Sequence, residues 1–356
     1  MIKTYTYKLK PNKNIEHKFN RWLGTCRFVY NCSKDLSEQS YLKGVRLTGF
    51  DIANQLVPAK KELPWVAGVH SQTLQAIIER YSGAMKKFFK GGGYPRWATK
   101  RGWKSVPFKS IKTTNNAFRL PSFGTVKVFS FKRPKGTLKT ASLIREADGI
   151  YLKVAVDEGD IEKANGENQA VCGIDMGIAF FLTTSDGEFV DNPKHLFARL
   201  KELRTANRSL ARKKKGGKNF YKQVERMQLL HQKVGRARKD FLHKESRKLA
   251  DRYGTIVRED LNIKGMSKNT KLSKHILDCG WGTFFGLLEY KTNVVKVDPK
   301  HTSQQCSECG HTCGENRKTQ SLFECVRCGY MENADLQATY NILQRGQSLL
   351  EAKVAC

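Results

Sequence analysis

The sequence predicts a mixed α/β protein with more than one domain. Its 356 residues exceed the roughly 150 residues of a typical domain. Segments with the period of β-strands lie at the N-terminus and between residues 126 and 190, and segments with the period of helices separate them. Near the C-terminus, two CxxC pairs indicate a small metal-binding module. We therefore expect an α/β multidomain fold.

The charge balance predicts a polyanionic partner. The chain carries 64 Lys and Arg against 33 Asp and Glu, a formal net charge of +31. Such an excess repels itself in a compact protein, and nucleic-acid phosphates are the simplest ligand that would balance it. A hydrophobic fraction of 39% argues against a disordered basic tail, and no apolar stretch is long enough for a membrane helix. We expect no membrane partner and a reducing, cytoplasmic location.

The N-terminal part predicts one strand followed by helices. The opening segment alternates apolar and polar side chains, with Tyr5 and Tyr7 on one face, as in a strand. The next segment, and a second one from Ser71, repeat apolar residues every three or four positions, as in amphipathic helices. Ser71 is a plausible N-cap of the second helix. We expect residues 11–90 to form a small helical domain.

A basic loop with aromatic side chains follows the helices. Tyr94, Arg96 and Trp97 lie in the string GGGYPRWATKRGW. Basic loops with interleaved aromatic rings can neutralise phosphates and stack on bases. The rings could equally anchor the loop to a core, and the sequence favours neither interpretation.

Short strands predict a small β-barrel at residues 1–10 and 91–168, into which the helical domain is inserted. The runs after residue 124 are rich in β-branched and aromatic residues. Asp148 and Gly149 lie between two of these runs, as the residues of a hairpin turn do.

The C-terminal half begins with a predicted antiparallel meander. The string VCGIDMGIAFFLTTSDGEFV contains three strands, with Asp175 in the first and a turn at Asp186 and Gly187. Residues 194–250 then have helical period on both sides of the break KKKGGK, which predicts a helical hairpin. Acidic partners are few on this hairpin, so its basic residues favour nucleic-acid contact over a solvated face. The residues we select are Arg204, Arg208, Arg212, Lys213, Lys214 and Lys215.

The two CxxC pairs predict one structural zinc site. Cys306 with Cys309 and Cys325 with Cys328 are separated by fifteen residues, a spacing typical of four-thiolate zinc modules. Four sulfurs fill the coordination sphere of zinc, so no position is open for catalysis. Cys313 lies outside both pairs.

Three carboxylates form a second candidate site. Asp175 lies in an apolar strand, where an unpaired charge is costly and a metal ion is a natural partner. TIVRED predicts a strand that ends at Glu259 and Asp260, and alternation allows either carboxylate to face inward. Asp335 lies near the start of the last predicted helix, on the face of its apolar residues.

These strings resemble a known nuclease family. GIDMG, TIVRED and NADLQATYNIL resemble the three split motifs of a RuvC-type nuclease with an RNase H fold. More closely, the whole chain resembles the TnpB proteins of bacterial and archaeal insertion sequences, which are relatives of type V CRISPR effectors. The supporting strings are RFVYN (27–31), GYPRW (93–97), EDLNIKGM (259–266), VDPKHTSQQCSECG (297–310) and ENRKTQSLFECVRCGYMENAD (315–335).

The resemblance implies an RNA-guided DNA endonuclease of a transposable element. Its partners would be a guide RNA from the element end and target DNA, double-stranded and single-stranded, cut next to a short fixed motif. By matching motifs, Asp175, Glu259 and Asp335 would be catalytic and would bind Mg²⁺ or Mn²⁺, with Glu259 preferred to Asp260. Zn²⁺ would be structural. The protein would be cytoplasmic and nucleoid-associated on DNA, as a monomer or a dimer.

The resemblance also implies a domain plan. Residues 1–10 and 91–168 would form the wedge barrel, and residues 11–90 the recognition domain. Residues 169–300 and 332–356 would form the RuvC-like nuclease domain, with the helical hairpin inserted. Residues 301–331 would be the zinc ribbon that loads target nucleic acid. The chain departs from the family after Lys291, where a helix that usually continues for about two turns is shortened.

Two other functions remain open. A guide-directed DNA-binding protein with weak or no cleavage would have the same basic surface, but it would usually lack one of the carboxylates. A transposase in the narrower sense would also use three acidic residues in an RNase H fold, but it would join DNA strands.

Overall fold

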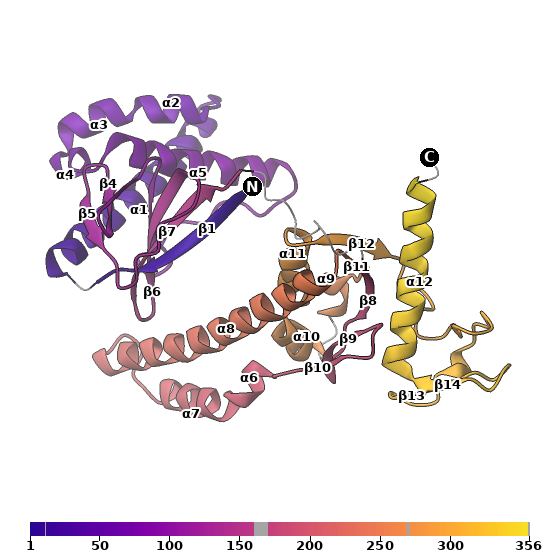
Figure 1. Cartoon of the computed structure of the whole chain (residues 1–356). Coiled ribbons are helices and arrows are strands. Elements are labelled where there is room, and N and C mark those ends of the chain that lie inside the picture. Colours follow the sequence, from indigo (N-terminus) through magenta and orange to yellow (C-terminus); the bar gives the residue numbers. More distant parts are fainter. Residues whose placement is uncertain (11, 160–169, 269–270, 355–356) are drawn as a thin grey trace. The chain divides into compact units, whose positions relative to one another are not determined.

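The computed structural model describes residues 1–10, 12–159, 170–268 and 271–354. The chain forms two compact units, Met1–Ile161 and Glu162–Cys356, and each is described separately (Figure 1).

A four-stranded antiparallel sheet runs through unit 1. Its strand order is β1-β7-β6-β2, so the N-terminal strand lies beside a strand about 150 residues away in the sequence (Figure 1). The strands are β1 (Ile2–Lys8), β2 (Ser105–Phe108), β6 (Thr137–Glu146) and β7 (Gly149–Asp157). The predicted alternation of β1 is confirmed, because Tyr7 is buried.

The turn between β6 and β7 lies one residue earlier than predicted. The ladder pairs Glu146 with Gly149, so the turn residues are Ala147 and Asp148. Gly149 opens β7 with a φ of +142°, a conformation that glycine adopts at low cost. Asp148 accepts hydrogen bonds from Lys8 Nζ (3.0 Å) and the Tyr151 hydroxyl (2.7 Å).

A second, three-stranded antiparallel sheet has the order β3-β4-β5. It consists of β3 (Lys112–Thr114), β4 (Ala117–Leu120) and β5 (Gly124–Lys127). A bridge between Leu9 and Val128 connects the ends of β1 and β5. Among the described residues of unit 1, the strands thus form two sheets linked at this bridge, and the closed barrel expected from the sequence is not shown.

Between β1 and β2, the described residues form five helices. They are α1 (Lys13–Leu42), α2 (Gly49–Asn54), α3 (Leu56–Glu62), α4 (Pro64–Ala67) and α5 (Ser71–Phe89). The Asn12 side chain caps α1 by accepting a hydrogen bond from the backbone N–H of Ile15 (3.1 Å). The predicted N-cap at Ser71 is wrong. His70 occupies the cap position, and the Ser71 hydroxyl instead accepts a hydrogen bond from Lys60 Nζ (2.7 Å).

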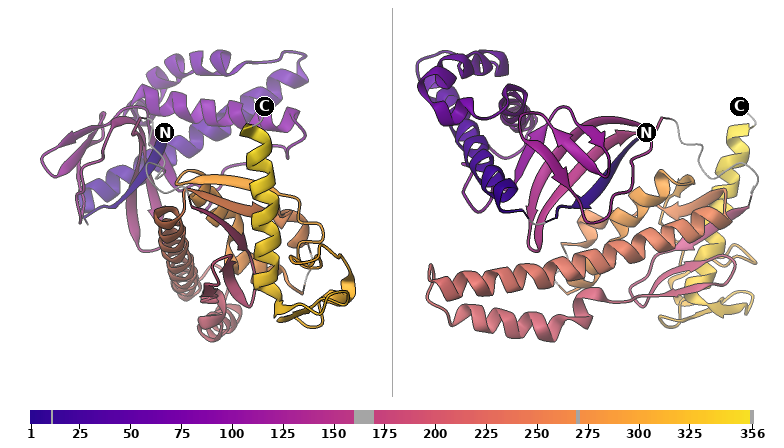
Figure 2. Two further views of the ribbon diagram at one scale, coloured as in Figure 1. Left: turned by 45° about the vertical axis from the view of Figure 1, so that its right-hand side comes forward. Right: turned by 60° about the vertical axis from the view of Figure 1, so that its left-hand side comes forward.

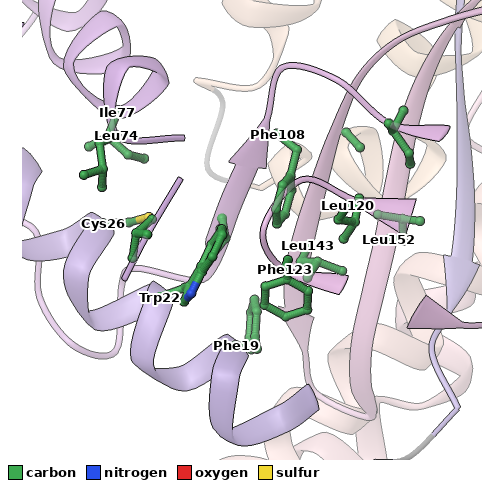
Figure 3. Packing of buried hydrophobic residues seen from close by; sticks show 14 of the residues in the cluster. Phe19, Trp22, Cys26, Leu74, Ile77, Phe108, Leu120, Phe123, Leu143 and Leu152 are labelled. Carbon is green, nitrogen blue, oxygen red and sulfur yellow. The ribbon is translucent and has the colours of Figure 1, made fainter. Parts of the chain in front are cut away.

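Helices and sheets of unit 1 share one hydrophobic core. Trp22 of α1 stacks on Phe108 of β2 at a centroid distance of 5.8 Å and meets Phe123 edge-on at 5.2 Å. Figure 3 shows these rings between α1 and the strands, with Leu74 and Ile77 of α5 near Cys26 of α1 in the same cluster. The helical segment therefore depends on the sheets for its core.

Unit 2 is built on a five-stranded mixed sheet with the order β10-β9-β8-β11-β12. The predicted meander is confirmed by β8 (Val171–Asp175), β9 (Phe180–Thr184) and β10 (Phe189–Asp191), which pair antiparallel. Strands β11 (Thr255–Glu259) and β12 (Asn293–Val297) continue the sheet parallel to β8.

The helical hairpin predicted between β10 and β11 is confirmed. It consists of α6 (His195–Ala198), α7 (Leu200–Ala211) and α8 (Lys218–Arg252). Leu203 and Ala206 of α7 pack with Leu230 and Val234 of α8, and the two helices lie side by side in both views of Figure 2. Further along α8, Leu242 joins the core of the sheet, so the far end of the hairpin projects from the sheet.

Opposite faces of the sheet are covered by different helices. One face packs with α8, α10 (Ser273–Cys279) and α11 (Trp281–Glu289), and the short α9 (Ile263–Met266) follows β11. The other face packs with α12 (Ala334–Val354), whose Ile342 contacts Val257 and Val297. Gly173 of β8 permits this approach, because a Cβ there would lie 2.5 Å from the carbonyl oxygen of Thr339.

A small module that contains the two CxxC pairs connects β12 to α12. It contains a 3₁₀ turn, η1 (Gly314–Asn316), and the hairpin of β13 (Leu322–Glu324) and β14 (Met331–Asn333). No helix in the described ranges combines the length and apolar character needed to cross a membrane.

Candidate metal centres

The four predicted cysteines converge on one point. The Sγ atoms of Cys306, Cys309, Cys325 and Cys328 all lie within 4.8 Å of one another. The Cys306–Cys328 and Cys309–Cys325 pairs are 3.7 Å and 3.6 Å apart. Four sulfurs about 2.3 Å from a tetrahedral zinc ion would be about 3.8 Å apart, so the cluster fits zinc. Cys313 lies outside the group, as predicted.

Two identical turns build the cluster. The N–H of Gly310 donates to the Cys306 carbonyl (3.0 Å), and the N–H of Gly329 donates to the Cys325 carbonyl (2.9 Å). Both glycines have a φ close to +70° (+71° and +72°), which a residue with a Cβ rarely adopts. The CxxCG spacing in the sequence predicts these turns because their contacts are local.

Asn316 is buried and connects the two turns. The sequence did not predict this role. Its Nδ2 donates to the carbonyls of Gln304 (2.8 Å) and His311 (3.1 Å), and its Oδ1 accepts from the N–H of Val326 (3.0 Å). An asparagine within a short loop has no pattern that would reveal this role.

The topology brings the three candidate carboxylates to the ends of neighbouring elements. The parallel register pairs Arg258 with Ile174, so the next residues, Glu259 and Asp175, lie side by side as the last residues of β11 and β8. Asp335 lies in the first turn of α12, beside β8. The side chain of Asn333 accepts hydrogen bonds from the N–H groups of Asp335 (2.9 Å) and Leu336 (3.2 Å) and so fixes this turn.

Burial and neighbouring charges make these carboxyl groups weaker acids than usual. Burial, followed by the charges of Glu259 and Asp335, raises the pKa of Asp175 to about 7. Burial also raises the pKa values of Glu259 and Asp335 above the ordinary range. Glu259 and Asp335 are near enough for their charges to act on Asp175, which is unfavourable without cations, and carboxylate oxygens are the hard ligands that Mg²⁺ and Mn²⁺ take. These residues could therefore hold divalent metal ions.

The structure distinguishes Glu259 from Asp260. The side chain of Asp260 is 68% exposed and lies 3.9 Å from the Arg258 guanidinium. Glu259 is instead partly buried and interacts with Asp175. Alternation could not separate them, because β11 is buried on both faces at Ile256, Val257 and Arg258.

Two residues near the zinc cluster contact the carboxylates and were missed from the sequence. The Thr302 hydroxyl donates a hydrogen bond to Glu259 Oε1. Arg317 Nη2 lies 3.4 Å from Asp335 Oδ1, and this pairing lowers the pKa of Asp335 against the larger effect of burial. Both contacts join residues distant in the sequence, which residue spacing does not reveal.

The aromatic residues of the basic loop pack around a cation of the protein itself. Lys34 Nζ lies 4.6 Å from the ring centroid of Tyr94 and 4.5 Å from that of Trp97. The Tyr94 hydroxyl also donates to Glu38 (2.9 Å). These contacts anchor the loop on α1, although both rings remain almost half exposed, at 43% and 50%. Arg96 is exposed.

The basic residues of the helical hairpin lie along one face. Arg204, Arg208 and Arg212 are exposed and are spaced four residues apart, so they share one side of α7 and its C-cap. Lys213, Lys214 and Lys215 extend the basic surface to the tip, where Lys213 is partly buried.

Family models match three parts of the chain. The OrfB_IS605 model, described as "Probable transposase", matches residues 152–270. A model described as "Cas12f1-like, TNB domain" matches residues 281–342, which include the cysteine cluster. A model described as "Helix-turn-helix domain" matches residues 1–44, where the structure has β1 and α1.

Two curated relatives match almost the full length. "Putative RNA-guided DNA endonuclease InsQ" of Escherichia coli K12 is 30% identical over 98% of this chain and 93% of that protein. A "Putative RNA-guided DNA endonuclease" of Streptomyces pristinaespiralis is 29% identical over 97% of this chain and 89% of that protein.

A solved structure supports the fold. CasPhi-2 (Cas12j) bound to crRNA has a TM-score of 0.50 at 11% identity, covering 97% of this chain and 98% of that chain. At this identity the likeness concerns the fold alone.

Proposed function

The chain belongs to the TnpB/OrfB_IS605 family of transposon-associated proteins, and on this basis we propose that it is an RNA-guided DNA endonuclease. The observation that carries the proposal is the meeting of Asp175, Glu259 and Asp335 at the ends of two parallel strands and a helix. The enzyme would hydrolyse DNA phosphodiesters at sites complementary to a guide RNA from the end of its own element and next to a short fixed motif.

We assign the RuvC-like, RNase H-type domain to residues 169–300 and 332–356. The support is a sheet with three antiparallel and two parallel strands, with α12 on one face and the basic hairpin inserted between β10 and β11. Residues 301–331 are the target-loading zinc module in this proposal. Residues 1–10 and 91–168 are the wedge, and residues 11–90 the recognition region. The boundary between residues 168 and 169 lies outside the described residues.

In the proposed mechanism, Asp175, Glu259 and Asp335 hold Mg²⁺ or Mn²⁺ through carboxylate oxygens. Ions bound there would activate a water molecule and stabilise the leaving 3′-oxygen. The Thr302 hydroxyl donates a hydrogen bond to one oxygen of the Glu259 carboxylate. The Arg317 guanidinium, which contacts Asp335 in the protein alone, provides a cation for the scissile phosphate. Zinc at the four cysteines fixes the module that carries both Thr302 and Arg317.

The guide RNA provides the sequence specificity and balances the charge. A net charge of +31 is more than a short DNA site needs, and an RNA scaffold would neutralise it. Base pairing with target DNA then selects the site, while the protein holds the displaced single strand and the flanking duplex.

We expect cleavage to require a guide RNA with about 20 complementary nucleotides. RNA-free protein, Mg²⁺ and a plasmid bearing the target should give no site-specific product, and adding the guide should restore it. A guide of unrelated sequence is the matched control. Site-specific cutting without RNA would show that the protein reads DNA by itself.

We expect the hairpin arginines to bind RNA through phosphates. Changing Arg204 and Arg208 together to glutamine should weaken guide binding and reduce the slope of log K against log[salt] by up to about 2. The matched control is Lys244→Gln with Arg247→Gln on α8, because these cations are already paired with Asp240 (2.7 Å) and Asp251 (2.6 Å). Filter binding over a salt series measures both pairs. If both double variants lost guide affinity equally, RNA binding could not be assigned to the arginines of α7.

A further inference from the structure

The segment that leads from β12 to the first zinc turn is fixed along α12. Three polar side chains of α12, spaced four residues apart, donate hydrogen bonds to backbone carbonyls of this segment. These bonds are Gln337 to Gln305 (3.0 Å), Asn341 to Thr302 (2.8 Å) and Gln305 (2.7 Å), and Arg345 to Asp298 (2.9 Å) and Lys300 (2.7 Å). Gln337 and Asn341 are almost completely buried. Helix α12 therefore fixes the path of residues 298–305.

Thr302 lies at the centre of this segment. Its side chain is buried, and its hydroxyl donates to Glu259 Oε1, 43 residues away in the sequence. The preceding residue, His301, has a φ of +62°, which a residue with a side chain adopts only at a cost. The surrounding hydrogen bonds maintain this unfavourable turn, and the turn directs Thr302 toward the carboxylate.

We propose that Thr302 is a positioning residue for Glu259, held in place by Asn341, and that it links the zinc module to the nuclease centre. Glutamate has several rotatable bonds, so a carboxylate without a partner would adopt several orientations. A hydroxyl bound to one oxygen restricts the carboxylate plane before a metal ion binds. This inference rests on the proposed function, because it assigns Glu259 as a metal ligand.

Helix α12 connects both sides of the proposed site. The same helix carries Asp335 in its first turn and holds Thr302 through Asn341 in its second. One rigid element thus sets the distance between Asp335 and the hydroxyl that orients Glu259. A disturbance of the zinc module would reach the carboxylates through this segment rather than through the metal ligands themselves.

The test compares Thr302→Val, which keeps the shape of the side chain but removes the donor, with Thr302→Ser, which retains the hydroxyl. Mn²⁺ binding, followed by electron paramagnetic resonance on the full chain, should weaken about 10- to 100-fold in Thr302→Val and return close to wild type in Thr302→Ser. Zinc content and the thermal midpoint should stay close to those of wild type. Thr312→Val, which removes an exposed hydroxyl that donates to the Gly310 carbonyl (3.4 Å), is the matched control.

A second variant tests the link to α12. Asn341→Ala should weaken Mn²⁺ binding as Thr302→Val does, and the double variant should be no weaker than either one. Unchanged Mn²⁺ affinity in Thr302→Val would overturn the inference, as would equal losses in the valine and serine variants. The result is independent of guided cleavage: a wild type that binds Mn²⁺ but never cuts DNA would contradict the proposed function and leave the role of Thr302 standing.

Discussion

Single replacement of Asp175, Glu259 or Asp335 by alanine should abolish guided DNA cleavage while guide and target binding are retained. The loss should be at least about 10³-fold, because each carboxylate would help to hold ions that stabilise the transition state by several kcal/mol. The duplex and the RNA should contact basic surfaces instead, so their affinity should change little. Single-turnover cleavage and filter binding of the same guide-loaded preparations measure the two effects.

Asp260→Ala is the internal control for this prediction. Its carboxylate is 68% exposed and lies 3.9 Å from the Arg258 guanidinium, so most activity should remain. If Asp260→Ala were inactive and Glu259→Ala active, the assignment of the second carboxylate would be wrong. If all three alanine variants cut as well as an active wild type, cleavage would take place at another site.

Asp175→Asn separates loss of function from loss of fold. Burial and the neighbouring carboxylates raise the pKa of Asp175 to about 7, so the folded protein binds this proton more tightly than the unfolded chain, in which the pKa is about 3.9. The wild type is therefore progressively destabilised as the pH rises from about 4 to about 7. Without metal ions, Asp175→Asn should have the higher thermal midpoint at pH 8, by about 5 °C, and the difference should shrink toward pH 4.

Long periodic segments and local spacings could be predicted from the sequence. The helices α7 and α8 follow from apolar repeats sustained over several turns, and the turn at Gly187 follows from a local dipeptide. The zinc site follows from two CxxC pairs, because each pair forms its own turn. In each case the determining contacts lie within a few residues.

Long-range pairings could not be predicted in the same way. Tyr94 and Trp97 pack on Lys34, about 60 residues earlier, so the string GYPRW alone left two interpretations open. The two sheets of unit 1 meet at the Leu9–Val128 bridge, and strand alternation does not encode which edges pair. Glu259 and Asp175 are neighbours only through the register of β8 and β11.

Specific contacts hold the end of the helix that precedes the shortened segment after Lys291. Helix α11 ends at Glu289, whose carboxylate pairs with Arg258 (3.2 Å) and Lys296 (3.1 Å) on the two adjacent strands. Arg258 also lies over the Phe285 ring and donates to the carbonyl of Glu259 (2.8 Å). The early end of the helix thus supports the strand that carries Glu259.

Replacing Cys306 or Cys325 by serine should remove zinc and destabilise the C-terminal unit. Both residues are buried in the cluster, and structural zinc contributes its binding free energy directly to folding. The wild type should contain about one zinc per chain, and either variant much less. Cleavage should fall with the zinc, because Thr302 and Arg317 reach the carboxylates from the segments that flank the two turns.

Cys313→Ser provides the matched control for this loss. Cys313 belongs to the same module but lies outside the four-sulfur group, so this variant should retain zinc, its thermal midpoint and its activity. Elemental analysis and thermal unfolding of the three variants measure the prediction. Full zinc content in Cys306→Ser would show that the sulfur is not a ligand. Zinc loss without loss of cleavage would show that the carboxylates keep their geometry without the zinc module. In that case, the hydrogen bond from Asn341 would be enough to hold Thr302 in place.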